Sequence, residues 1–370
     1  MSPSPTTNVQ RLRRLLQRLD LQAALLRSAA SFAWATEGAA SYINIAATEG
    51  EAGLLVTPGD AYLLTNNIEA PRLEREECLH EQGWTFKVSP WYEQADTVSQ
   101  LTRGMKVGTD FPSPVPGAPD LQDIRRPLSR LRAELTPQEG QRFRELGRLC
   151  AEAMDEAAQA VRPGMSEHEI AALLAAAAQK RGVWPTVVLI AGDERIFRFR
   201  HPLPTEKKLA RYAMLILCGR RHGLVCSLTR FVHFGPLPDD VARKARAVAA
   251  VDAALIQATR PGRRAGDVFQ AGVEAYAANG YRDEWQKHHQ GGPAGYEPRE
   301  YLVTADSEEQ IIAGQVYAWN PSITGTKSED TILVGNEGNE VLTAIDGWPT
   351  LEVDAGDGQT LSRPAILQRD

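Results

Sequence analysis

The segment Arg162-Pro163-Gly164-Met165-Ser166-Glu167 decides the fold, because its first three residues return as Arg260-Pro261-Gly262. In both places Arg-Pro-Gly follows one helix-like stretch and precedes another, which ends at Gly182 in the first copy and at Gly280 in the second. Both pairs are separated by 98 residues (260 − 162 and 280 − 182). Arg-Pro-Gly is common after a helix, so the turn alone indicates little. Two landmarks at one spacing favour an internal duplication of helix, turn, helix and strands.

Capping signals mark where the helices of this repeated unit begin. Thr136-Pro137-Gln138-Glu139 is a capping box with proline at the first helical position, and it predicts a helix that runs to about Val161. Ser166, with a glutamate three residues later, caps the next helix, and the second copy predicts a helix over 248–259. Strand-like apolar runs follow the helix pairs at 186–191, 213–218, 224–234, 315–319 and 331–334. A site at the centre of such a unit would draw residues from both halves.

The residues before the repeated unit predict a smaller α/β domain. A leucine stripe predicts a helix over 9–26, and apolar runs separated by turn residues predict strands at 53–57 and 61–65. The segment 110–120 holds four prolines, which predicts a loop or linker, and 121–135 predicts a helix.

Length and composition limit the class of protein. A chain of 370 residues is expected to hold two domains, and we place the boundary near Glu134, giving domains 1–133 and 134–370. The net charge of −6 argues against a nucleic-acid or anionic-membrane partner. The four cysteines form no CxxC pair, residues 1–10 lack the apolar run of a signal peptide, and no stretch approaches the ~18 apolar residues of a membrane span. These features predict a cytoplasmic protein.

Five motifs together point to a known family. They are Arg162-Pro163-Gly164-Met165-Ser166-Glu167, Phe199-Arg200-His201-Pro202, Ser227-Leu228-Thr229-Arg230, His288 with Gly291 and Gly295, and Glu329-Asp330-Thr331-Ile332-Leu333-Val334. In these motifs the chain resembles the creatinase / aminopeptidase P / prolidase family, from about residue 8 to 350. The resemblance implies an α/β (α+β) fold: a pita-bread catalytic domain with internal pseudo-twofold duplication, preceded by a smaller creatinase-type N-terminal α/β domain.

The resemblance also implies a metal site, which this sequence does not keep. Peptidases of the family hold two divalent metal ions with two Asp, one His and two Glu side chains, because bridging carboxylates offset the repulsion between the ions. Those five positions fall on Leu217, Ser227, Gly292, Asn320 and Glu329. One carboxylate cannot neutralise two divalent ions. Placing His289 on the metal histidine instead would still leave only two ligands. The sequence therefore predicts no catalytic metal and no cofactor.

The residues around the five ligand positions match the family's pattern better than the ligand positions themselves do. His201 falls on the family's substrate-binding histidine and His288 on its second active-site histidine, while Lys327 and Arg299 bring positive charge where the metals would be. The predicted catalytic residues are His201, His288, Glu329 and Ser227, and the predicted substrate-binding residues are Asn320, Lys327, Arg299 and His289.

Several of these residues keep a second interpretation. Ser227 is either a nucleophile activated by a histidine or, as we favour, a small neutral filler. Glu329 is either catalytic or a remnant held by the neighbouring lysine, and the Asn320 amide either binds a substrate carbonyl or satisfies the backbone. Cys218 and Cys226 flank the lost ligands, and strand alternation predicts that they point to the opposite face, into the core.

Two hypotheses for function follow. The first is a metal-independent hydrolase of a C–N bond in a small peptide or amide-like substrate with an anionic end, in which an imidazole acts as general base. The second is an inactive pseudo-peptidase that binds a peptide or protein partner in the cleft that holds the active site in the family's peptidases. An ordinary Xaa-Pro metallopeptidase ranks last, because the ligands are missing. The family resemblance further implies a homodimer and a small-molecule or short-peptide ligand.

Overall fold

The computed structural model describes residues 5–93, 96–111, 121–355 and 358–370. The chain forms two compact units, Met1–Arg132 and Ala133–Asp370, whereas the sequence placed the boundary between residues 133 and 134. Most of the predicted proline-rich loop, 112–120, lies outside the described residues. Within the described ranges, no helix combines the length and the hydropathy needed to span a bilayer.

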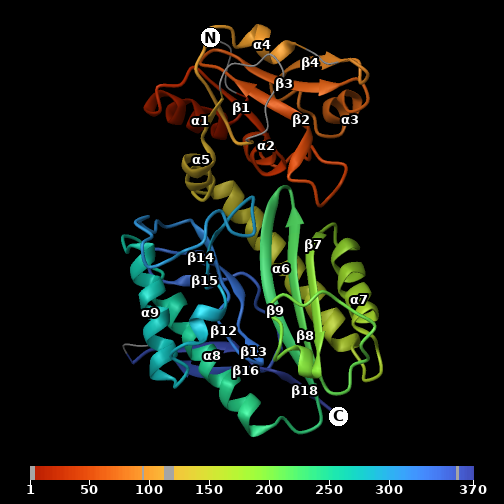
Figure 1. Ribbon diagram of the computed structural model, residues 1–370, viewed down its shortest axis with the longest axis vertical. Coiled ribbons are helices and arrows are strands. Elements are labelled where there is room, and N and C mark those ends of the chain that lie inside the picture. Colours follow the sequence, from red (N-terminus) through yellow and green to blue (C-terminus); the bar gives the residue numbers. More distant parts are fainter. Residues whose placement is uncertain (1–4, 94–95, 112–120, 356–357) are drawn as a thin grey trace. The chain divides into compact units, whose positions relative to one another are not determined.

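The first unit is a mixed sheet with flanking helices (Figure 1). Its strands pair in the order β4-β3-β2-β1-β5-β6. They are β1 (Ala23–Ser28), β2 (Glu49–Val56), β3 (Ala61–Asn66), β4 (Thr85–Ser89), β5 (Val107–Thr109) and β6 (Leu121–Asp123). The helices are α1 (Thr7–Arg18), α2 (Ala29–Ala35), α3 (Ala70–Arg75), α4 (Thr97–Leu101) and α5 (Arg125–Arg132). Strand β1 is antiparallel to β2 and parallel to β5.

Two helix predictions in this unit are wrong. The helix predicted over 9–26 ends at Arg18, where Asp20 takes a left-handed φ of 54°, and the following apolar run is the central strand β1. The helix predicted over 121–135 is instead the edge strand β6 followed by α5. The Asp123 carboxylate separates the two by accepting a hydrogen bond of 2.9 Å from the Arg125 backbone N–H, an Asx-type start for the helix.

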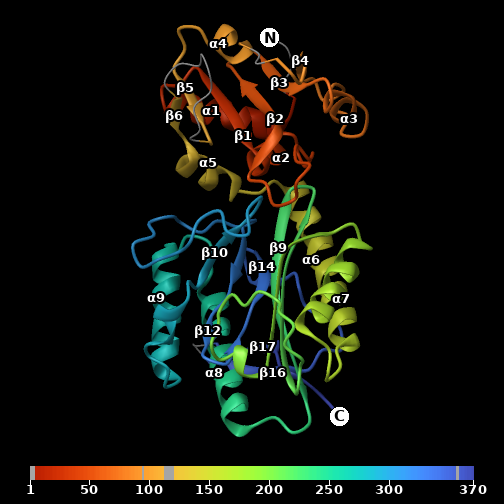
Figure 2. The same ribbon diagram turned by 45° about the vertical axis from the view of Figure 1, so that its right-hand side comes forward.

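The second unit places two four-stranded sheets between two helix pairs (Figures 1 and 2). The sheets have the strand orders β18-β9-β8-β7 and β10-β11-β14-β15. The helices are α6 (Pro137–Ala160), α7 (Glu167–Gln179), α8 (Asp239–Ala258) and α9 (Ala265–Ala278), with short 3-10 turns η1 (Asp193–Arg195) and η2 (Glu284–Lys287). The strands are β7 (Trp184–Gly192), β8 (Tyr212–Arg221), β9 (Leu224–Phe234), β10 (Gly291–Ala294), β11 (Val316–Trp319), β12 (Ser322–Ile323), β13 (Thr326–Lys327), β14 (Asp330–Val334), β15 (Asn339–Val341), β16 (Thr350–Asp354), β17 (Thr360–Pro364) and β18 (Leu367–Arg369).

The duplication is visible in the backbone of the two halves. Gly164 and Gly262 take φ values of 85° and 84°, a region that favours glycine. Their N–H groups donate hydrogen bonds of the same length, 2.8 Å, to the carbonyls of Leu209 and Ile311. Helices α7 and α9 follow these turns. The mixed α/β fold predicted from the sequence is therefore confirmed, including its repeated unit.

One helix of the second half is longer than predicted. Helix α8 begins at Asp239 rather than at residue 248. Pro238 stands at its N-cap, and Asp239 and Asp240 lie in the first turn, where negative charge interacts favourably with the helix dipole. Asp252 lies in this helix and is completely buried.

Candidate functional site

Charged and polar side chains of the second unit surround Glu329, which lies between β13 and β14. Arg299 Nη2 donates to Glu329 Oε1 at 3.0 Å, and Lys327 Nζ lies 2.9 Å from Oε2. Thr229 Oγ1 donates to the same Oε2 at 2.6 Å. The side chains of Arg299, Lys327 and Glu329 are only 9%, 7% and 3% exposed. Both oxygens of the carboxylate are therefore engaged by side chains of this chain.

This cluster keeps Glu329 ionised. Burial alone would raise the pKa of the carboxyl, but Lys327 and Arg299 outweigh burial and lower the pKa to about 2. Two positive groups and one negative group leave a net charge of +1 in the cluster.

Ser227 lies at the edge of this cluster, fully buried on β9. Arg299 Nη1 donates to its Oγ at 3.2 Å, and the Cys218 thiol lies 3.3 Å from the same oxygen. Neither partner is a general base, because the guanidinium is positive and burial raises the pKa of Cys218 to about 11. These contacts favour the filler interpretation of Ser227 over the nucleophile.

The structure corrects the prediction for Cys218 and Leu217. Cys218, not Leu217, is paired directly with Ser227 across β8 and β9, so the thiol faces the site. Leu217 pairs with Leu228 and is completely buried. Cys226 was placed correctly: its thiol contacts Cys150 of α6.

A local signal could have set this register. The hairpin turns at His222-Gly223, with positive φ values of 48° and 77°. A two-residue turn with both central residues at positive φ is the type I′ hairpin, and glycine at its second position is the usual sequence sign. Counting back from that turn pairs Cys218 with Ser227.

Gly292 cannot carry a ligand side chain in this backbone. It lies in β10, and a Cβ there would stand 2.3 Å from the Tyr301 carbonyl oxygen. Asn320, which follows β11, is 3% exposed, and its Oδ1 has no hydrogen-bond partner among the described residues. The buried amide oxygen is therefore an acceptor that a ligand N–H could satisfy.

The five positions do not fit a pair of divalent ions. They offer a leucine or a protonated thiol, a serine, a glycine, an amide and one carboxylate whose oxygens already bind a lysine and an arginine. Adding two divalent ions beside a net positive cluster would leave their charge uncompensated.

Three histidines form a second cluster beside this one. His201 follows η1, and His288 and His289 follow η2; one side-chain nitrogen from each lies within 4.8 Å of the others. His288 Nε2 and His201 Nε2 are 3.0 Å apart, and the ring centroids of His288 and His289 are 4.3 Å apart. The sequence predicted all three as site residues, and the fold brings them together across 87 residues.

The hydrogen bonds fix which ring nitrogens carry protons. Burial, followed by Lys327, lowers the pKa of His288 to about 3, and burial also lowers the pKa of His201, so both rings are neutral near pH 7. His288 Nδ1 lies 2.6 Å from the His289 carbonyl, which can only accept, so Nδ1 carries the proton. His288 Nε2 is then an acceptor and His201 Nε2 its donor. The lone pair of His201 therefore lies on Nδ1.

A buried ion-pair network packs next to the site, and sequence reasoning missed two of its members, Asp252 and Arg363. Arg363 lies 2.5 Å from Asp330 and 2.7 Å from Asp252, and Arg230 lies 2.7 Å from Asp330. Ser328 donates to Asp252 at 2.6 Å, which anchors the residue before Glu329. All four charged side chains are at most 2% exposed. No motif marks Asp252 or Arg363, because their meeting depends on the tertiary fold.

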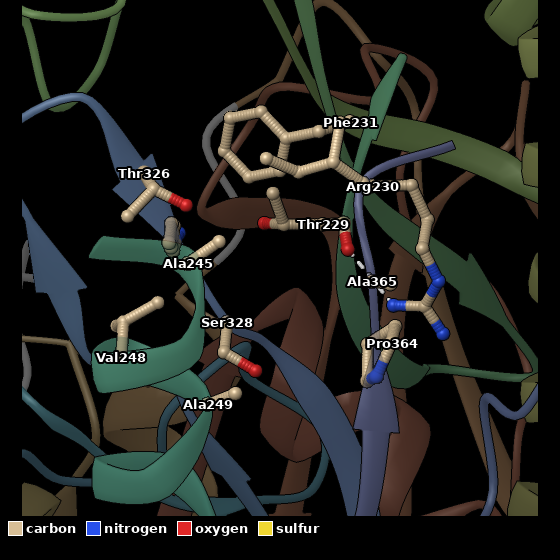
Figure 3. Close-up of a pocket in the computed structure, with 12 residues that line it drawn as sticks. Thr229, Arg230, Phe231, Ala245, Val248, Ala249, Thr326, Ser328, Pro364 and Ala365 are labelled. Carbon is tan, nitrogen blue, oxygen red and sulfur yellow. Dashed lines mark hydrogen bonds between the residues drawn. The ribbon is translucent and has the colours of Figure 1, made fainter. Parts of the chain in front are cut away.

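The cavities next to these clusters are small. One of ≈ 10 Å³ is lined by Thr229, Thr326, Lys327 and Ser328, with α8 along one side (Figure 3). A second cavity of ≈ 10 Å³ is lined by His288, Lys327 and the partly exposed Phe199. Each has room for about one water. A substrate would meet the site from the side of exposed His201.

Two family descriptions match this chain. Metallopeptidase family M24 matches residues 141–336, and the Creatinase/Prolidase N-terminal domain matches residues 8–118. Among curated proteins, an uncharacterized peptidase of Staphylococcus haemolyticus is 27% identical over 237 residues, covering 60% of this chain and 66% of the relative. One from Staphylococcus aureus (strain MW2) is 26% identical over 232 residues, covering 60% and 65%. The matches thus span just under two thirds of these relatives.

Solved structures share the fold at low identity. The prolidase from Pyrococcus horikoshii OT3 superposes with a TM-score of 0.79 at 18% identity, covering 92% of this chain and 99% of that one. The Xaa-Pro dipeptidase from Bacillus anthracis gives 0.78 at 18%, covering 99% and 100%. Likeness at this identity shows the fold alone.

Proposed function

The chain belongs to metallopeptidase family M24, and on that premise we propose that it hydrolyses a C–N bond in a small peptide or amide-like substrate with an anionic end, without the family's pair of metal ions. The buried cluster of Glu329, Lys327 and Arg299 carries this proposal, because two side-chain cations lie where metal charge would be needed. Its net charge of +1 favours a carboxylate over a guanidinium on the substrate.

His201 is the general base of this proposal. Its neutral ring, with the lone pair on Nδ1, takes a proton from water while the water oxygen bonds to the carbonyl carbon. The carbonyl electron pair moves to oxygen, where the positive charge of Lys327 and Arg299 stabilises it. The intermediate then collapses as the C–N bond breaks, and His201 returns the proton to the leaving nitrogen. His288 orients His201 through their shared hydrogen bond.

Asn320 and the two cations, Lys327 and Arg299, recognise different groups of the substrate. The unpartnered Asn320 Oδ1 accepts an N–H of the substrate, and Lys327 and Arg299 attract its anionic end. Converting the substrate carboxylate to an amide removes this attraction and should therefore raise KM at least tenfold. The contacts at the C–N bond to be cleaved should stay the same.

The test is turnover of Xaa-Pro dipeptides and related small amides by the full chain, with and without a chelator. We expect activity that the chelator does not reduce and that His201→Ala lowers by 10²-fold or more. His168→Ala, an exposed histidine in the same unit, is the matched control and should keep full activity. Chelator-sensitive cleavage with two bound metal ions per chain would overturn the proposal.

Two observations favour a binding protein as the second candidate. Lys327 and Arg299 are already paired with Glu329, and Ser227 lacks a base, as expected after loss of catalysis. In that case no amide is turned over, yet peptides bind by calorimetry and Arg299→Met weakens the binding. Absence of both turnover and peptide binding would contradict this candidate.

A further inference from the structure

We propose that His201, His288 and His289 form a binding site for one divalent transition-metal ion such as Zn²⁺. Their ligand nitrogens lie within 4.8 Å of one another. None of the three occupies the positions of Leu217, Ser227, Gly292, Asn320 or Glu329, so this is a separate, mononuclear site.

The geometry is close to that of a three-histidine zinc site. Zn–N bonds of about 2.0–2.1 Å in a tetrahedron set ligand nitrogens about 3.3 Å apart. The Nε2 atoms of His201 and His288, now 3.0 Å apart, need to open by a few tenths of an ångström. The widest pair needs to close by at most about 1.5 Å. The fourth position then remains for water or a substrate atom.

The hydrogen bonds outside the cluster prepare it for a metal. His288 Nδ1 donates to the His289 backbone carbonyl at 2.6 Å, which fixes the ring and leaves the Nε2 lone pair directed at His201. Metal-binding histidines commonly donate their other ring nitrogen to a carbonyl or carboxylate in this way. His289 Nδ1 is buried without a hydrogen-bond partner among the described residues.

The donor set and the surrounding charges decide which ions bind. Three imidazoles suit zinc, cobalt, nickel and copper, whereas magnesium, calcium and manganese prefer oxygen ligands. Lys327 lines the same small cavity as His288, and together with Arg299 it exceeds the negative charge of Glu329. This net positive charge weakens the binding of any divalent cation. Removing the lysine charge with Lys327→Met should therefore tighten Zn²⁺ binding by about tenfold or more.

Occupancy of the site has a consequence that rests on the proposed function. The metal binds the lone pairs of His288 Nε2 and His201 Nε2; the His201 proton moves from Nε2 to Nδ1, so the hydrogen bond between the two rings breaks and Nδ1 no longer has a free lone pair. The proposed base is then bound to metal, and Zn²⁺ inhibits hydrolysis.

The experiment titrates Zn²⁺ into the metal-stripped full chain by calorimetry, with the visible absorption of Co²⁺ as a second readout of nitrogen coordination. We expect one ion per chain, with affinity at least tenfold lower in His288→Ala and His289→Ala and unchanged in His168→Ala. His201→Ala, at an exposed position, serves if the partly buried variants fail to fold by circular dichroism.

Binding that all three histidine variants leave unchanged would overturn the proposal, as would binding of two ions that depends on Glu329. Because the readout is binding, a chain that turns over no amide when stripped of metal, yet binds one Zn²⁺ through these histidines, refutes the proposed hydrolase and supports the metal site.

Discussion

At the residue scale, Glu329 is the side chain on which the charges of the site depend. It is 3% exposed and is the shared partner of Lys327 and Arg299, which are themselves buried. A buried ion pair adds little net stability, but removing one partner leaves the others uncompensated. The carboxylate therefore stabilises the fold whether or not it also takes part in catalysis.

Glu329→Gln should lower the free energy of unfolding by about 3–5 kcal/mol, because two buried cations lose their counter-charge. Urea denaturation measures this. Glu340→Gln removes an exposed pair with Arg144, both about half exposed, and should cost under about 1 kcal/mol. Equal effects in the two variants would contradict the assignment.

The histidine cluster predicts a pH dependence of stability. Burial and neighbouring positive groups lower the pKa of His288 to about 3 and that of His289 to about 4. The unfolded chain binds protons at these residues below about pH 6.5, whereas the folded chain does not until about pH 4. The free energy of unfolding should therefore fall as the pH drops from 6.5 towards 4.

Urea midpoints at pH 7.5 and 5.0 check this expectation. In His288→Asn/His289→Asn the fall between the two pH values should be smaller than in the parent chain, since the variant lacks both groups. An unchanged slope would assign the acid sensitivity to other residues.

At the scale of elements, strand β10 excludes a ligand at the position of the family's metal histidine. Gly292→Ala would place a Cβ 2.3 Å from the Tyr301 carbonyl oxygen, and the clash should destabilise the fold by about 1–3 kcal/mol. Gly140→Ala in α6 is the control, because its Cβ meets no atom within 4 Å and alanine favours a helix. Thermal melting compares them; a neutral Gly292→Ala would mean that β10 can move away.

In the β8–β9 hairpin, the pairing register decides which side chains face the site. Each strand was predicted within a few residues, yet Leu217 was placed at the site instead of Cys218. A shift of one residue moves a side chain to the other face of a sheet. The His222-Gly223 turn fixes the register of this pairing. The paired residues therefore have to be counted from the turn rather than assigned from a motif.

At the scale of the whole molecule, Arg363 ties the end of the second unit to its centre. It joins Asp252 of α8 to Asp330 of β14, and Asp330 in turn holds Arg230 of β9. The residues that frame Glu329 thus depend on a strand near the C-terminus.

Arg363→Ala should lower the free energy of unfolding by about 3–5 kcal/mol, because Asp252 and Asp330 lose a buried partner. Arg246→Ala, which removes only an exposed side chain that donates to the Glu352 carbonyl, is the matched control and should change it by under about 0.5 kcal/mol. Chemical denaturation followed by tryptophan fluorescence compares the two. A neutral Arg363→Ala would assign the support of the site to other contacts.

The sequence by itself determined the repeated helix–turn–helix unit, the capped helices α6 and α7, and the strands β7, β8, β9, β11 and β14, because caps, turn glycines and apolar periods act over a few residues. It also named His201, His288, Lys327, Arg299 and Glu329 as neighbours, through family resemblance rather than physics. Only the tertiary structure decided that Arg299 binds the second oxygen of Glu329 and that three histidines from two loops converge. Those contacts join residues far apart in the chain, and their geometry depends on packing between separate elements, which no local signal contains.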